Sequence, residues 1–336
     1  MKEGMCNSPV RIMEMASAFY ESCVLLASSD LGIFRALAEL GEADAVTIAG
    51  VCRLDDRGAR LLLDACVAVG LLTKTGNAYR STPEASAFLS PGSPADLSGA
   101  IRYNRDVYDA WGKLTEMAKT GRPVERPGLH LGEDPERTRT FVLAMHGRAL
   151  GIGRAVIPHL DLAGRQRLLD VGGGPATYSM LIAGAFPGVE CTVIDLPEVA
   201  RIADELITQS GMRDRVRTLP GDYHQVRFPD ANDAVIFFGV LHQETPDAIR
   251  GLLQRAHAAL VTGGTIYILD MMTDSTHTQP KFSALFALNM ALTTPHGWVF
   301  SESELKGWLA EAGFNDFRCQ PLPPPMPHWM ASAIKR

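Results

Sequence analysis

Positive charge is scarce in this chain, since 32 Lys and Arg face 38 Asp and Glu and leave a formal net charge of -6 at pH 7. Nucleic-acid-binding proteins normally present a basic face, so this balance argues against a polyanionic partner. No apolar run reaches the roughly 18 residues of a membrane-spanning helix, and the first residues lack the apolar core of a signal peptide. The sequence therefore predicts a cytoplasmic protein that binds neither nucleic acid nor a membrane.

Cysteine is also sparse, and none of the six residues belongs to a Cys-x-x-Cys pair. We expect reduced thiols, in the core or at the surface, at Cys6, Cys23, Cys52, Cys66, Cys191 and Cys319. A metal site has equally little support, because His242 and His296 have no clear third ligand. No bound metal is predicted.

The length of 336 residues favours two domains, and the N-terminal part has a pattern of its own. Apolar residues recur at helical spacing over 16–39, and two shorter helices are expected over 47–52 and 55–69. Two strands then flank a Thr-Gly-Asn turn at 75–77. Helices followed by a small hairpin form a winged-helix outline, which we assign to a mainly helical domain of residues 1–100.

The helix over 55–69 occupies the position that reads DNA in winged-helix proteins. It offers only Arg57 and Arg60, beside three Asp residues, whereas phosphate contacts need more positive charge. We therefore interpret this domain as a packing or dimerisation module and expect a homodimer.

Pro and Gly are concentrated between 91 and 136, around a helix near 103–118, and a longer helix follows over 137–159. Residues 101–160 are interpreted as a helical connector. The remaining chain, 161–336, forms the second domain.

Strands alternate with helices in this second domain. Its β-like apolar runs lie at 167–171, 190–194, 215–219, 233–238 and 265–270. Such alternation is typical of a Rossmann-like, doubly wound α/β domain with helices on both faces of a mostly parallel sheet. A helix over 301–312 and two strand-like pieces then predict a terminal antiparallel hairpin.

The sequence LLDVGGGPATYS is the strongest sign of a ligand site. An apolar strand ends at Asp170 and runs into three glycines, which let the backbone approach a ligand at the carboxyl edge of the sheet. A dinucleotide fingerprint, GxGxxG, would need a further spaced glycine that this run lacks. NAD is therefore an imperfect match.

Two later carboxylates complete the pattern of a nucleoside site. Asp195 ends the next strand, where a carboxylate can accept both hydroxyls of a ribose. In LPGDYHQ, Asp222 can reach an adenine amino group while Tyr223 stacks on the ring. The structural alternatives are a helix N-cap before Pro197 for Asp195 and a turn residue after Gly221 for Asp222.

The ordered motifs DVGGG, VIDLP and GD resemble those of class I S-adenosylmethionine-dependent methyltransferases. The resemblance covers nearly the whole chain and is closest to small-molecule O-methyltransferases such as the plant caffeic acid and animal acetylserotonin enzymes. It implies dimerisation through the N-terminal domain and S-adenosyl-L-methionine as the cofactor. The cofactor-binding residues that it implies are Asp170, Gly172, Gly173, Gly174, Asp195, Leu196, Gly221, Asp222, Tyr223 and Phe238.

A catalytic base is expected after the strand that ends at Phe238. His242 lies there, at the edge where open α/β sheets bind ligands, and an imidazole can remove a hydroxyl proton near neutral pH. The resembled family carries its catalytic histidine in an LHDW-like segment, which implies the same role for His242 in VLHQE. Gln243 and Glu244 here replace the Asp and Trp of that segment.

The carboxylates expected to support this histidine are fewer than in the plant enzymes. Asp270 ends the next strand where those enzymes have glutamate, and the resemblance makes it a catalytic residue. A second supporting glutamate is absent, since Val299 occupies its place. Ser301 and Glu304 instead predict a capping box at the last helix.

The acceptor pocket is expected between the connector and a helix within 281–298, the region that lines this pocket in the resembled family. A stripe of Phe and Met at helical spacing is also compatible with plain core. Arg148 can hold a carboxylate. The predicted acceptor-binding residues are His146, Arg148, Phe286, Asn289, Met290 and His296.

The leading hypothesis is methyl transfer to a hydroxyl or phenol of a small molecule, with His242 as general base. Methylation of sulfur, nitrogen or carbon stays open, because such a reaction can proceed through proximity and desolvation alone. A non-catalytic regulatory binding protein and an NAD-dependent oxidoreductase are the less favoured alternatives.

Overall fold

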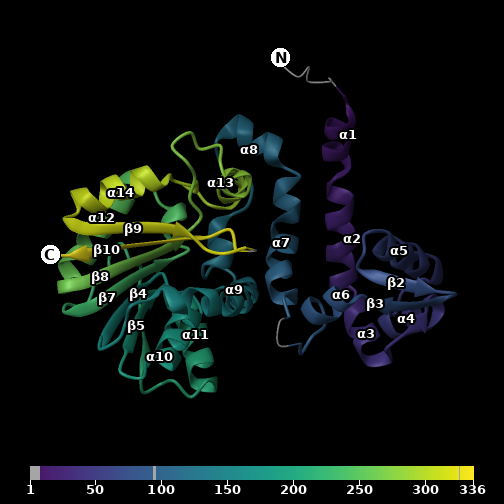
Figure 1. The fold of residues 1–336 in the computed structure, drawn as a ribbon, viewed down its shortest axis with the longest axis horizontal. Coiled ribbons are helices and arrows are strands. Elements are labelled where there is room, and N and C mark those ends of the chain that lie inside the picture. The colour runs from purple at the N-terminus through teal and green to yellow at the C-terminus, as the bar shows by residue number, and fades with distance from the viewer. Residues whose placement is uncertain (1–7, 94–95, 325) are drawn as a thin grey trace, which may run out of the picture. The chain divides into compact units, whose positions relative to one another are not determined.

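The computed structural model describes residues 8–93, 96–324 and 326–336. The chain folds into two compact units, Met1–Arg105 and Asp106–Arg336, each of which is described by itself (Figure 1). Cys6 lies outside the described residues, and the other five cysteines are free thiols, as expected. Within the described ranges, no helix combines the length and the apolar character needed to cross a bilayer.

The first unit is mainly helical. Its helices are α1 (Val10–Ser17), α2 (Phe19–Asp30), α3 (Ile33–Leu40), α4 (Ala45–Cys52), α5 (Asp56–Ala68) and α6 (Pro83–Phe88). Strands β2 (Leu72–Thr75) and β3 (Ala78–Ser81) form the expected hairpin. A short strand that the sequence did not reveal, β1 (Ala43–Asp44), pairs with β3 and gives the antiparallel order β1-β3-β2.

Side-chain caps fix where the helices of this unit begin. Asp44 accepts a hydrogen bond from the Thr47 amide at 2.9 Å, and Asp55 accepts one from the Gly58 amide at 2.9 Å. The apolar faces then meet in a core that includes Ile33, Phe34, Ile48, Leu63 and Tyr79. Helix α1, by contrast, buries none of its residues.

The second unit is built on a seven-stranded sheet of order β6-β5-β4-β7-β8-β10-β9. The parallel strands are β4 (Arg167–Val171), β5 (Glu190–Asp195), β6 (Val216–Pro220), β7 (Asn232–Phe238) and β8 (Leu260–Asp270). Strands β9 (Phe314–Pro321) and β10 (Trp329–Lys335) are antiparallel and form the expected terminal hairpin.

Helices cover both faces of this sheet. Those that pack on its two faces include α9 (Pro135–Val156), α10 (Thr177–Ala185), α11 (Pro197–Gln209), α12 (Pro246–Ala259) and α14 (Glu302–Glu311). The unit also contains α8 (Leu114–Thr120), α13 (Lys281–Thr293) and the end of α7 (Ser98–Trp111). In β7, Val235 and Phe237 pack on the side of α12 and α14, whereas Ala234 and Ile236 pack toward α9, α10 and α11 (Figure 1). This alternation follows from the two-residue period of a strand.

The predicted fold class is confirmed. The five strand-like runs form the parallel part of the doubly wound sheet, and a winged-helix-like unit precedes it. Strand β8 begins at Leu260, earlier than the predicted start at 265. Gly263 and Gly264 interrupt the apolar pattern there, although the backbone stays paired with β7 on both sides of an irregularity.

Candidate active site

The carboxyl ends of the parallel strands gather the predicted site residues at one edge of the sheet. The strand order reverses between β4 and β7, and such a switch point opens a crevice for ligands. The predicted cofactor residues after β4, β5 and β6 lie on one side of this point. His242 and Asp270, which follow β7 and end β8, lie on the other.

The backbone of the glycine loop needs residues without side chains. Gly172 and Gly174 have φ of +68° and +54°, in the left-handed region. A Cβ atom at Gly172 would lie 2.8 Å from Val240 Cγ2 and 3.5 Å from Tyr223 Cε1. The loop after β4 therefore packs directly against the loops after β6 and β7.

Asp170 is buried beneath this loop. Its Oδ2 accepts a hydrogen bond from the Ser179 hydroxyl at 2.7 Å, while its Oδ1 has no hydrogen-bond partner among the described residues. Burial, opposed by the Ser179 hydrogen bond and aided by the charge of Asp195, raises the pKa of Asp170 to about 7. A buried polar atom without a partner costs about 1–3 kcal/mol, so this oxygen is suited to a ligand that donates a proton or carries positive charge.

Asp195 is held by two backbone amides. Its Oδ2 accepts from the Gly174 amide at 2.7 Å, and its Oδ1 accepts from the Leu196 amide at 2.7 Å. Each carboxylate oxygen can still accept a further hydrogen bond. The N-cap alternative is wrong, because Leu196 is the N-cap residue of α11 and the helix has no side-chain cap. Burial raises the pKa of Asp195 to about 6.

Asp222 and Tyr223 follow Gly221 after β6. Asp222 accepts hydrogen bonds from the His224 amide at 2.8 Å and from the Gln225 side-chain amide at 3.0 Å. The turn alternative thus describes the local geometry of Asp222. The Tyr223 hydroxyl donates to Glu244 Oε1 at 2.6 Å, and burial raises the pKa of this tyrosine.

His242 lies in a short 3-10 turn, η3 (Leu241–Gln243), and contacts Asp270 twice. The ring Nδ1 is 2.6 Å from Asp270 Oδ1, and the His242 amide donates to Asp270 Oδ2 at 3.3 Å. An ionised carboxylate only accepts hydrogen bonds, so it fixes the proton on Nδ1 and leaves the lone pair on Nε2. This tautomer is the one that a general base requires.

Trp298 and Glu244 hold the same turn from another direction. The Trp298 amide donates to the His242 carbonyl at 2.9 Å, and the indole donates to the Glu244 carbonyl at 2.8 Å. The Glu244 carboxylate also lies 3.1 Å from His224 Nε2. Sequence reasoning identified Glu244 only as a replacement in the LHDW-like segment, because nothing in the sequence links it to Trp298, 54 residues away.

The predicted acceptor residues on α13 lie in different surroundings. The Phe286 ring meets His242 edge to face at 5.3 Å between centroids. Phe286 and Met290 are buried with Val299 in one small cluster, so Val299 fills the place of the absent glutamate with an apolar contact. Asn289 accepts a hydrogen bond from the Trp111 indole at 2.8 Å.

The remaining predicted acceptor residues are more dispersed. His146 Nδ1 is 2.7 Å from the Thr177 hydroxyl, at the first residue of α10, so this histidine borders the glycine loop. Arg148 is half-buried on α9, and His296 is exposed in the loop after α13. The described residues contain no group of three His, Cys, Asp or Glu side chains placed to hold a metal ion.

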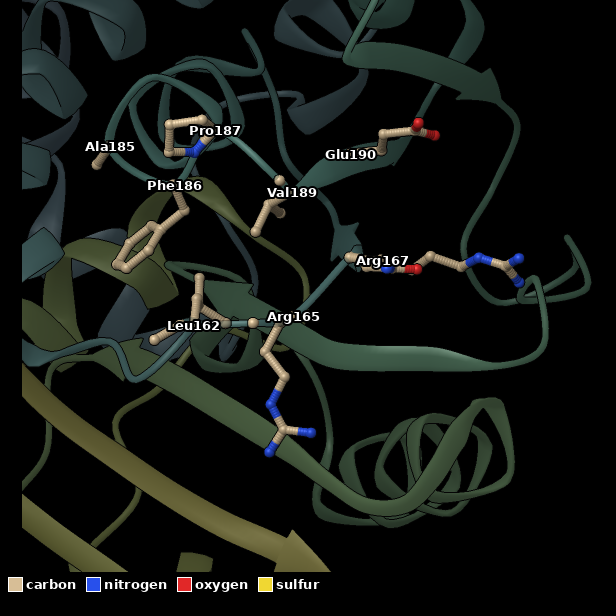
Figure 2. A pocket seen from close by; sticks show the side chains of 12 residues that line it. Leu162, Arg165, Arg167, Ala185, Phe186, Pro187, Val189 and Glu190 are labelled. Atoms are coloured by element: carbon tan, nitrogen blue, oxygen red, sulfur yellow. The ribbon is translucent and has the colours of Figure 1, made fainter.

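A cavity of about 620 Å³ lies at the opposite edge of the sheet. It is lined by the segments 162–167 and 185–190, which precede β4 and β5 (Figure 2). The length of the strands separates it from the carboxyl edge, and it contains none of the predicted site residues. We therefore assign the active site to the carboxyl edge.

The fold and this edge define a class of protein: a doubly wound nucleoside-cofactor enzyme with a histidine–aspartate pair across the crevice. The family model of the O-methyltransferase domain matches residues 125–315, and the model of the O-methyltransferase dimerisation domain matches residues 13–91. The chain belongs to the O-methyltransferase family.

Similar proteins cover nearly the whole chain. It is 30% identical over 331 residues to 3-hydroxy-5-methyl-1-naphthoate 3-O-methyltransferase of Streptomyces sahachiroi, which covers 97% of this chain and 95% of that protein. It is also 30% identical over 332 residues to the N,N-dimethyltransferase OxyT of Streptomyces rimosus, and this match covers 96% of each protein. The crystal structure of human N-acetylserotonin methyltransferase in complex with S-adenosylmethionine has a TM-score of 0.88 and 27% sequence identity, over 100% of this chain and 99% of that one.

The protein is an S-adenosylmethionine-dependent methyltransferase of small molecules, so the predicted enzyme class and cofactor are confirmed. The oxidoreductase and non-catalytic alternatives are wrong. The residues at the edge fit a cofactor that carries positive charge, because Asp170 has an unpartnered buried oxygen and Asp195 has remaining acceptor capacity. The side-chain-free cradle at Gly172 and Gly174 allows close approach of a ligand.

Proposed function

We propose that this enzyme methylates an aromatic hydroxyl group, with His242 as general base and Asp270 as the residue that orients it. The observation that carries the proposal is the 2.6 Å contact between His242 Nδ1 and Asp270 Oδ1 at the carboxyl edge of the sheet. S-adenosylmethionine supplies an electrophilic methyl group when bound. A phenol becomes a stronger nucleophile as it loses its proton, and Nε2 of His242 has the lone pair to receive that proton.

The protonated imidazole would then be stabilised in place. As the acceptor oxygen becomes methylated, its proton moves to His242 Nε2, and the buried Asp270 carboxylate lies against the imidazolium that forms. The Phe286 ring packs against the His242 ring with the two ring planes nearly perpendicular. Bulk solvent takes the proton when the product leaves.

The cofactor is proposed to bind across the loops after β4, β5 and β6. Asp195 would accept the ribose hydroxyls, Asp222 and Tyr223 would hold the adenine, and Asp170 would face the methionine end. The loop glycines permit this approach. The remaining proposed contacts are Gly172, Gly173, Gly174, Leu196, Gly221 and Phe238.

An aromatic acceptor is proposed because Phe286 and Met290 offer an apolar wall beside His242. The naphthoate enzyme and the acetylserotonin enzyme are both named for aromatic acceptors. His146, Arg148, Asn289 and His296 remain proposed acceptor contacts.

The base is tested by replacing His242 with Gln, which keeps a polar side chain of similar size. With 3-hydroxy-1-naphthoate and N-acetylserotonin as first acceptors, we expect kcat to fall by about 10²–10⁴-fold. The dissociation constant of S-adenosylmethionine, measured by calorimetry, should change less than threefold. Asp195→Ala is the matched control and should weaken cofactor binding instead. Near-normal turnover of the His242→Gln variant would rule out the base.

Nitrogen methylation is a second candidate function, favoured by the similarity to OxyT over nearly the whole chain. A neutral amine already presents its lone pair, so a base is dispensable for it. Retained methylation of arylamines by the His242→Gln variant, with loss of phenol methylation, would identify this activity.

We also propose that the protein is a homodimer in the cytoplasm. The dimerisation-domain match over 13–91 supports the dimer, as do the exposed apolar side chains of α1 and the start of α2. These include Ile12, Met15 and Phe19, which are 70%, 64% and 51% exposed. The functional division into 1–100, 101–160 and 161–336 remains part of this proposal.

A further inference from the structure

The turn between β9 and β10 carries a histidine to the edge where the acceptor would bind. Trp329, the first residue of β10, pairs with Asp270, the last residue of β8. Because β10 runs antiparallel to β8, its amino end lies at the carboxyl edge of the parallel strands. His328 immediately precedes Trp329 and therefore lies at the same edge as the His242–Asp270 pair.

His328 is buried, and its hydrogen-bonding capacity is not met within the described protein. His328 is 8% exposed as a whole residue. Its Nδ1 atom is buried and has no hydrogen-bond partner among the described residues. Its carbonyl accepts from the Leu322 amide at 2.8 Å, which fixes the backbone that presents the ring. An unsatisfied buried nitrogen costs about 1–3 kcal/mol, and a ligand that bonds to it would remove this cost.

Positive charge lies near this ring. Burial, and then the electrostatic effects of Arg148 and His242, lower the pKa of His328 to about 3, so its imidazole is neutral. Arg148 lies on α9, two residues after His146, whose ring contacts the first residue of α10. The charge of Arg148 also acts on Tyr178, the second residue of α10.

The Asp270 carboxylate at this edge already has hydrogen-bond donors of its own. Asp270 accepts from the His242 ring and amide and from the Met271 amide at 2.8 Å. These three contacts hold Asp270 against His242 and the backbone, so it is not a partner for the His328 ring.

We propose that His328 and Arg148 form a subsite beside His242 for a carboxylate of the acceptor, which makes the substrate a hydroxyaryl carboxylic acid. The inference rests on the proposed function, since it requires the acceptor to lie against His242. The guanidinium supplies the charge and donor groups that bind carboxylates, and the neutral imidazole supplies one N–H. A carboxylate accepts from both, which satisfies His328 Nδ1.

The test compares acids with their neutral isosteres. Binding of 3-hydroxybenzoate and 3-hydroxy-1-naphthoate, and of the corresponding primary amides, is measured by calorimetry on the protein saturated with S-adenosylhomocysteine. We expect at least one acid to bind tenfold or more tightly than its amide. His328→Phe and Arg148→Met should each reduce that ratio below threefold. His257→Gln is the matched control, because His257 packs on Phe314 at the opposite edge and should leave the ratio unchanged.

The carboxylate subsite would be overturned if each acid bound with the same affinity as its amide. It would also be overturned if none of the four compounds bound. So would an unchanged ratio in folded His328→Phe protein, with retained S-adenosylhomocysteine binding as the criterion of folding. If the variant does not fold, ¹⁵N spectra of histidine-labelled wild-type protein decide, because the acid but not the amide should shift the His328 ring signals. Methylation of neutral phenols that is lost in His242→Gln would preserve the proposed function even if this subsite failed.

Discussion

At the scale of single residues, one buried carboxylate, Asp170, and one half-buried carboxylate, Asp195, lie on the cofactor side of the crevice at a cost to the free protein. Asp170 and Asp195 both have raised pKa values because burial disfavours their charged forms. The charge of Asp195 raises the pKa of Asp170 further. A bound ligand that carries positive charge would offset part of this cost.

Asp170→Asn should stabilise the protein at high pH while weakening cofactor binding. The pKa of Asp170 rises from its ordinary 3.8 to about 7 on folding, so folding takes up a proton between these values and stability falls as pH rises through them. The gain for the variant should be near zero at pH 4 and at most about 4 kcal/mol at pH 8, measured by urea denaturation. Asp247→Asn, at a side chain that is 97% exposed, is the control. A variant equally or less stable at pH 8 would contradict the ionisation argument.

At the scale of elements, Glu244 connects two loops that serve different ligands. Its carboxylate accepts from Tyr223 in the proposed adenine loop, and its carbonyl accepts from Trp298, whose amide holds His242. The loop after β6 is thereby tied to the turn after β7. Cofactor affinity and turnover should therefore respond together to a change at this carboxylate.

Glu244→Ala should raise the dissociation constant of S-adenosylmethionine and lower kcat, each by about tenfold, because a buried charge-assisted hydrogen bond is worth about 1.5–3 kcal/mol. Glu244→Gln keeps an acceptor for the Tyr223 hydroxyl and should recover most of both losses. Tyr223→Phe combined with Glu244→Ala should cost little more than Glu244→Ala alone. Fully additive effects of the two substitutions on binding would show that the loops are independent.

At the scale of the whole molecule, α1 is a helix that buries none of its residues within the single chain. Ile12 and Met15 on α1 and Phe19 at the start of α2 recur at i, i+3 and i+7 spacing and are all exposed. An exposed apolar stripe of this kind marks an interaction surface. A second copy of the chain is the proposed partner.

Ile12→Asp combined with Met15→Asp should convert the dimer to a monomer, because charges replace apolar side chains in the buried interface. Analytical ultracentrifugation should show a mass reduced by half and a dimer dissociation constant raised at least 100-fold. Arg11→Asp changes the charge of the same helix without removing apolar area and serves as the control. Wild-type protein that sediments as a monomer at micromolar concentration, or a doubly substituted protein that stays dimeric, would refute this interface.

The sequence by itself determined the fold and the order of its ligand-binding loops. Two-residue apolar alternation specifies strands, helical spacing specifies the covering helices, and glycines mark backbone that approaches a ligand. Strand ends in a parallel sheet meet at one edge, so Asp170, Asp195 and His242 could be assigned to one site from local signals, and the family resemblance added Asp270. The sequence does not indicate that a strand can continue through an irregularity in its pairing. The predicted β8 was therefore too short.

Only the tertiary structure decided which side chains meet. Trp298 contacts Glu244 across 54 residues, and His328 reaches the same edge through an antiparallel strand pair that carries no motif. Contacts of this kind depend on packing between elements that are remote in sequence. Neither the spacing of residues nor the composition predicts such packing. The sequence determined where the chemistry lies because that information is local, whereas the surroundings of the acceptor arise only when the sheet is assembled.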